Sequence, residues 1–149
     1  MATKRAKARA IATKRAKAGA MAAKEAKAEA LATAQDITDQ RDSDIELLDD
    51  KIREAIGMKN DLAIGDPRRR DLDGVINQLM ASRTDLAIQE LMAGLGSAQL
   101  AAALAKITAA SQELKDEAAK MKKITSFINN TNAVIGAATK ITNIVKNGG

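Results

Sequence analysis

The clearest regularity in the chain is a heptad-spaced run of apolar and small residues in its second half. The positions step alternately by four and three residues, which places them on one stripe of an α-helix. They are Leu100, Leu104, Ile107, Ser111, Leu114, Ala118, Met121, Thr125 and Ile128. Because Ser111 and Thr125 are polar and Ala118 is small, this seam is weak for an isolated dimer. We expect it to pack inside a bundle, and an intermolecular coiled coil is the alternative.

Two helices are expected before this seam. Ser43 and Glu46 have the spacing of a capping box, which predicts a helix that starts at Ser43 and ends near Gly65. Asp66 followed by Pro67 predicts the start of a second helix, whose apolar positions run from Leu72 to Met92. The sequence "GLGS" at 94–97 ends that helix and offers Ser97 as the cap of the next one.

The last segment of the chain repeats the same period after an interruption. The sequence "NNTN" at 129–132 is typical of a turn or kink, and Val134, Ala138, Ile141 and Val145 then resume the helical spacing. With one proline and nine glycines, the chain has little turn chemistry for a many-stranded sheet. We therefore predict an all-α fold, a helical hairpin or a coiled-coil-like bundle of three to four helices over residues 36–149.

The first 35 residues carry no apolar stripe. A ten-residue unit containing K-x-A-K-A is written three times, and its copies close on Ile11, Met21 and Leu31. Ten residues fall about 80° short of three helical turns, so these apolar residues move around the helix instead of forming one face. Alanine favours helix, but nothing here can dock it on a core. We separate residues 1–35 as a helical or disordered arm from the domain at 36–149.

Charge divides the chain at the same place. The net charge of the protein is +5, but residues 1–35 carry +7 and residues 36–66 carry −6. The basic residues of the first two repeat units are Lys4, Arg5, Lys7, Arg9, Lys14, Arg15 and Lys17. Positive charge concentrated near one end indicates an arm that contacts a polyanion.

The Lys- and Ala-rich repeat over about residues 1–32 resembles the tails of linker-histone-like proteins in composition. On this hypothesis the arm contacts phosphates without reading sequence, because no aromatic, Asn or Gln residue is interleaved with the basic ones. Two alternatives stay open: the arm is a solvated helix or tail that aids solubility, or it pairs with the acidic segment. Attraction to anionic lipid is a further, less favoured alternative, since the arm has no apolar face.

Catalytic chemistry has few candidate residues. The chain contains no His and no Cys, so the commonest general base, the thiol nucleophile and the soft metal ligands are missing. The acidic run at 36–50 lacks the Gly-centred loop of a calcium site. We expect no enzyme activity, no cofactor and no metal.

A second basic cluster, Arg68, Arg69 and Arg70, follows the predicted helix start at Pro67. A helix N-terminus favours anions, which makes this cluster a candidate phosphate or acidic-partner site. The alternative, which we favour, is a solvated first turn whose arginines pair with Asp66 or Asp71.

Residues 91–110 form the least charged stretch, with small residues that permit close helix approach. A membrane-inserting hairpin over 91–146, as in pore-forming or translocator proteins, would use such a segment, but a buried bundle helix is the favoured interpretation. The chain starts basic and lacks the apolar segment of a secretion signal, so a cytoplasmic location is the default expectation.

The function expected from the sequence is structural or interactive. The helices associate with themselves or with a helical partner, and the arm engages a polyanion such as nucleic acid. A membrane-active helical protein is the alternative.

Overall fold

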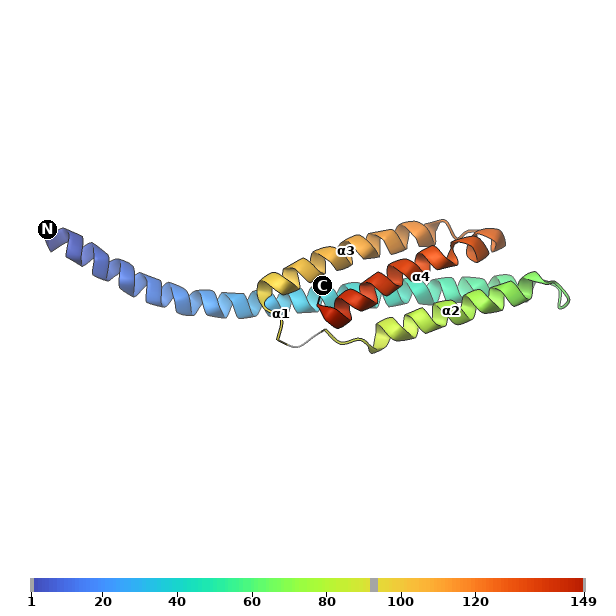
Figure 1. Cartoon of the computed structure of the whole chain (residues 1–149), viewed down its shortest axis with the longest axis horizontal. Helices are drawn as coiled ribbons and strands as arrows, with labels where there is room; N and C mark the ends of the chain where they lie inside the picture. Colours follow the sequence, from blue (N-terminus) through green and yellow to red (C-terminus); the bar gives the residue numbers. More distant parts are fainter. Residues whose placement is uncertain (1, 92–93, 149) are drawn as a thin grey trace.

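The computed structural model describes the backbone of residues 2–91 and 94–148, and the side chains of residues 27–91 and 94–148. Four helices make up the fold: α1 (Ala2–Asp61), α2 (Arg68–Ile88), α3 (Ser97–Ala119) and α4 (Ile124–Asn147). They pack side by side as a bundle, and the first part of α1 projects beyond it (Figure 1). The predicted all-α bundle is confirmed, in its four-helix form.

Each helix of the bundle packs mainly on two neighbours, and α1 and α4 also touch across the bundle. α1 lies against α2 and α3, and α4 lies against the same two helices from the opposite corner. The turns at 62–67 and 120–123 make the pairs α1–α2 and α3–α4 antiparallel, while residues 89–96 connect α2 to α3 across the diagonal (Figure 1). The end of α4, the described parts of the α2–α3 connection (89–91 and 94–96) and the projecting part of α1 therefore lie at one end of the bundle (Figure 1).

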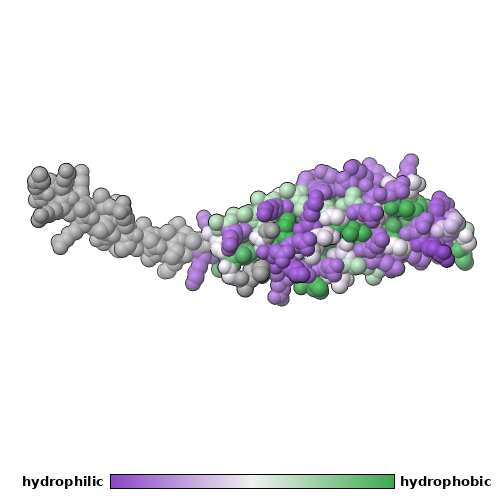
Figure 2. All heavy atoms as spheres, in the orientation of Figure 1, coloured by the Kyte–Doolittle hydropathy of each residue, from purple (hydrophilic) through white to green (hydrophobic). Residues whose placement is uncertain are grey.

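The core is aliphatic and fills the space between all four helices. Phe127, the only aromatic residue of the chain, is fully buried in it. Leu48 of α1, Leu79 of α2 and Leu114 of α3 are fully buried as well. Alanines at core positions let the helices approach closely, as the scarcity of large side chains requires. Apolar residues on the visible outer face are scattered among hydrophilic ones (Figure 2).

The helix start predicted at Ser43 is wrong. α1 runs without interruption from Ala2 to Asp61, so Ser43 is an exposed residue inside a helix. The face buried in the bundle already includes Ile37, and Ala30 packs against the core, so the apolar face begins before the predicted cap. Packing of that face outweighs the local capping signal.

The turn predicted at 129–132 is also wrong, as is one continuous helix over the seam. The break lies at 120–123, and α4 passes straight through Asn129–Asn132. Two of the four side chains of "NNTN" form hydrogen bonds within the helix pair: Thr131 donates to the Phe127 carbonyl, and Asn130 Nδ2 donates to the Glu117 carbonyl at 2.5 Å. The other two, Asn129 and Asn132, are exposed. Ser126 Oγ accepts the backbone N–H of Lys123 at 2.8 Å and starts α4.

The other two predicted boundaries are close to those observed. Asp66 Oδ1 accepts the backbone N–H of Arg68 at 2.9 Å, as a helix-capping carboxylate does. The residue that precedes α3 is Gly96 rather than Ser97, and the Gly96 N–H donates to Gln99 Oε1 at 3.0 Å. α2 ends at Ile88, so Leu91 belongs to the connection.

The end of α4 depends on a glycine. Gly148 has a φ of 72°, in the left-handed region, and its N–H donates to the Ile144 carbonyl at 2.8 Å. A Cβ atom at this position would lie 2.8 Å from Leu95 Cδ1. Gly148 thus both ends α4 and lets it pack against the 89–96 connection.

Candidate functional site

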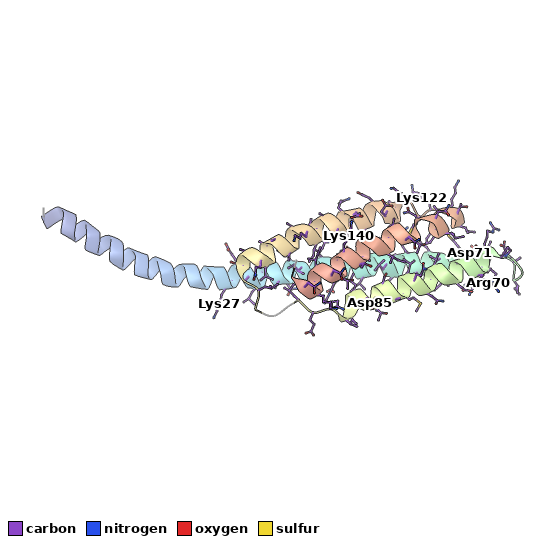
Figure 3. The ribbon with its side chains drawn as sticks, in the orientation of Figure 1. Lys27, Arg70, Asp71, Asp85, Lys122 and Lys140 are labelled. Atoms are coloured by element: carbon purple, nitrogen blue, oxygen red, sulfur yellow. The ribbon has the colours of Figure 1, made fainter. Side chains whose placement is uncertain are left out.

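The basic residues predicted to bind a polyanion all lie on α1, in the part that projects from the bundle (Figure 1). Lys4, Arg5, Lys7, Arg9, Lys14, Arg15 and Lys17 lie outside the residues whose side chains are described. The first described side chains belong to Lys27 and its neighbours, and Figure 3 marks Lys27 at the place where α1 leaves the bundle. α1 therefore joins the basic segment directly to the folded body without a linker.

The seam residues predicted for helix packing lie mostly in the bundle core. Leu100, Ile107 and Leu114 are buried in α3, and Met121 is buried in the turn that follows it. Leu104 and Ile128 are partly buried against the same core. Thr125 is exposed, since the break at 120–123 ends the heptad spacing. The seam thus packs against helices of its own chain. The heptad spacing predicted Ile128 as a core residue, but Phe127 is the fully buried residue there and Ile128 is only partly buried.

The three arginines of the second basic cluster have different surroundings. Arg69 Nη1 donates to the backbone carbonyls of Lys59 at 2.9 Å and Leu62 at 2.8 Å, so it caps the C-terminal end of α1. Arg68 forms a fork with the Asp66 carboxylate, whose shortest contact is 2.6 Å from Nη2 to Oδ2. That hydrogen bond lowers the pKa of Asp66 to about 2. Arg70 is exposed at the end of the bundle (Figure 3).

A shallow groove lies beside this cluster, lined by Ile64, Gly65, Pro67 and Arg70 among others. Arg69 and Asp66 also line this groove. Arg69 is bonded to the C-terminal end of α1, and Asp66 accepts a backbone N–H at the start of α2. The cluster therefore presents Arg70 as its free cation among the described side chains, and two of its three arginines hold the α1–α2 turn.

The buried acid Asp44 was not predicted as a special residue. Its side chain is fully buried on the inner face of α1, and its Oδ2 atom accepts the Ser111 hydroxyl of α3 at 2.6 Å. Burial raises the pKa of the Asp44 carboxyl, and the hydrogen bonds from Ser111 and Gln40 and the charge of Lys115 offset this only in part. Its Oδ1 atom has no hydrogen-bond partner among the described residues.

A second polar contact, close to Asp44 in the sequence, joins α1 to the start of the α2–α3 connection. Arg41, one helical turn earlier, donates through Nη1 to the Gln89 carbonyl and so holds the α2–α3 connection against α1.

A buried acid at a core position is invisible to a search for apolar periodicity, because Asp breaks the pattern. The only signal was its helical spacing, four residues before Leu48 and eight before Ile52.

Chemistry that would hold a ligand is sparse on the described part of the chain. A groove of about 300 Å³ between α2 and α4 is lined by polar residues such as Ser82, Asp85, Thr139 and Asn143. Among the residues with described side chains, no three acids are grouped as a metal site would need. Within the same residues, no helix has the length and apolarity required to cross a bilayer.

Comparisons with known proteins place the chain in no group. No protein-family model, no curated protein and no solved structure matches it.

Proposed function

We propose that the chain is a non-catalytic interaction protein, in which a self-contained helical bundle presents the basic segment of α1 to a polyanion. The favoured polyanion is nucleic acid, bound without regard to sequence. The observation that carries this proposal is the change of charge along the chain: +7 over residues 1–35 and −2 over the rest of the chain.

The position of the charge supports this proposal. The first residue of α1 that packs against the core in the described part is Ala30. The preceding residues of the helix would reach about 40 Å beyond that point at 1.5 Å per residue. Seven basic residues over the first 17 positions would then have access to many phosphates of a duplex, which carries one charge per about 1.7 Å of its axis.

The composition of the segment supports the lack of sequence preference. Residues 1–34 contain no aromatic side chain to stack on a base and no Asn or Gln to read a base edge. Their contacts with nucleic acid would be those of lysine and arginine with phosphate, which position a protein but carry no sequence information.

The test compares two variants of equal net charge. In the arm variant, Lys4, Arg5, Lys7 and Arg9 are replaced by Gln. In the body variant, Lys106, Lys122, Lys123 and Lys146 are replaced by Gln; all four are exposed, and no ion pair is seen for them in the described residues. Binding of a labelled random-sequence DNA duplex is measured by fluorescence anisotropy.

We expect the arm variant to lose most of the affinity and the body variant to keep it. The physical reason is that local charge density near the duplex, and not net charge, sets the number of phosphate contacts. Equal losses in the two variants would contradict the proposal. Preference for anionic vesicles over DNA by the unaltered chain would indicate lipid as the polyanion.

A further inference from the structure

The outer face of α1 carries a stripe of acidic residues. Its members are exposed and recur at helical spacing; they are Asp39, Asp42, Glu46, Asp50 and Glu54. Ile37, Leu48 and Ala55, which are buried, lie on the opposite side of the same helix. We call these five acids the acidic stripe. It faces away from the bundle.

No other helix covers the acidic stripe. Asp50 pairs with Arg53 at 2.5 Å and Glu54 with Lys51 at 3.0 Å, both within α1. Asp39 accepts a hydrogen bond from Gln35 at 2.8 Å, again within α1. Among the described side chains, Glu46 has no cationic partner. Asp42 pairs with Arg41 at 3.5 Å, so three of the five acids have ion pairs within α1, and no described residue of another helix pairs with the stripe.

The basic part of α1 has a complementary pattern in the sequence. Lysines occupy positions 7, 14, 17 and 24, and Leu31 follows seven residues later. At 100° per residue these positions fall in the same sector of the helix as the acidic stripe. Leu31 is 73% exposed and offers an apolar side chain to a second copy. One side of α1 is therefore basic in its first half, acidic in its second, and apolar between them.

A single chain cannot bring these two halves together. α1 is one helix from Ala2 to Asp61, with no turn at which the lysines could fold back. Two antiparallel copies of α1 can do so. If the midpoint lies near Leu31 and Ala32, positions 24, 17 and 14 of one copy face positions 39, 46 and 50 of the other to within about one residue, and position 7 faces position 54 to within about two.

We propose that the protein forms a two-fold symmetric dimer through this face of α1. Lys24, Lys17, Lys14 and Lys7 of each copy pair with Asp39, Glu46, Asp50 and Glu54 of the other, and the two Leu31 side chains meet near the symmetry axis. Such an interface is the same patch on both chains and closes at two copies. The two bundles lie at opposite ends of the dimer, because the two copies of α1 run antiparallel. The buried face of α1, with Ile37, Leu48 and Ala55, stays on the side away from the interface.

This inference goes beyond the proposed binding of a polyanion and stands independently of it. Lys4, Arg5, Arg9 and Arg15 fall outside the paired sector of α1 by the same 100° arithmetic. These four basic residues would stay available to phosphate in the dimer. The test is done without nucleic acid, so its failure would leave the polyanion proposal in place.

The experiment uses two charge-reversed full-length chains. The stripe variant carries Asp39→Lys and Glu46→Lys, and the arm-reversed variant carries Lys17→Glu and Lys24→Glu. Sedimentation velocity at about 50 mM salt gives the mass of each species, where exposed charges are weakly screened. The unaltered chain should be a dimer whose dissociation constant rises at least about tenfold at 300 mM salt.

Each variant alone should be monomeric, since like charges then face each other on both sides of the axis. An equimolar mixture should form a heterodimer, because at the altered positions and those facing them one chain then presents lysines and the other acids. A control with Glu90→Lys and Asp116→Lys has the same charge change as the stripe variant, at exposed positions outside the stripe, and should stay dimeric. Circular dichroism shows that each variant keeps its helices.

Three results would overturn the proposal. They are a monomeric unaltered chain at low salt and high protein concentration, a failure of the two variants to associate with each other, and loss of the dimer in the control as well.

Discussion

The two halves of α1 belong to one helix but are stabilised by different interactions. Residues 37–61 bury Ile37, Leu48, Ile52 and Ala55 against three other helices. Residues 1–35 have more alanine and a net charge of +7 but no apolar stripe of their own. Helix propensity therefore favours a helix in both halves, but packing of an apolar face determines which half contributes to the stability of the fold. We expect substitutions in the two halves to separate stability from binding.

The largest expected effect comes from the core. Phe127→Ala removes the only aromatic residue from a site where it is fully buried, and should lower the free energy of unfolding by about 3–5 kcal/mol. Urea unfolding measures this change. The arm variant, with four basic residues replaced, should change the same free energy by less than about 0.5 kcal/mol. A comparable loss in both proteins would show that the arm is part of the folded core.

A second prediction concerns the buried acid. Asp44→Asn should raise stability at neutral pH, because burial disfavours the ionised form of the Asp44 carboxyl in the folded state and the amide removes that cost. The folded-state pKa is raised above the ordinary 3.8, so the group contributes stability below 3.8 that is lost as the pH rises through the folded value.

The thermal midpoint of the unaltered chain should accordingly fall over that range, and the difference from Asp44→Asn should widen as the pH rises. Ser111→Ala, which removes the hydrogen bond to Asp44 Oδ2, should lower the midpoint instead. An Asp44→Asn protein that is less stable than the unaltered chain at pH 7 would contradict this explanation.

A smaller effect distinguishes two neighbouring basic residues at the start of α2. Arg69→Gln removes two hydrogen bonds to the carbonyls that end α1, and should cost about 1–2 kcal/mol in the free energy of unfolding. Arg70→Gln, at an exposed neighbour, is the matched control and should cost less than about 0.5 kcal/mol. Equal effects of the two substitutions would argue against the capping role of Arg69.

The sequence predicted the helices better than their ends. The core lies where the apolar period predicted it: along the seam from Leu100 to Met121, and at Val134, Ala138, Ile141 and Val145. The period alone determines which face of a helix is apolar. The boundaries at Ser43 and at "NNTN" were wrong because polar residues were read as caps or breaks. In the structure they are exposed, or they bond to a helical carbonyl, as Thr131 does.

The missed residues share one property. Asp44 and Arg41 act through contacts with residues distant in the sequence, namely Ser111 and the Gln89 carbonyl. Local spacing carries no information about such partners before the order of the helices in the bundle is known. The charge of the arm, in contrast, is fully visible in the sequence, and its role remains a proposal.

The proposal that the basic arm binds DNA and the bundle does not is tested most directly by the salt dependence of DNA binding. The logarithm of the binding constant falls linearly with the logarithm of salt concentration, with a slope of about −0.9 per phosphate contact. The arm variant should therefore have a slope shallower by about 3–4 than that of the unaltered chain, and the body variant of equal net charge should keep the original slope. Indistinguishable slopes for the two variants would contradict the account.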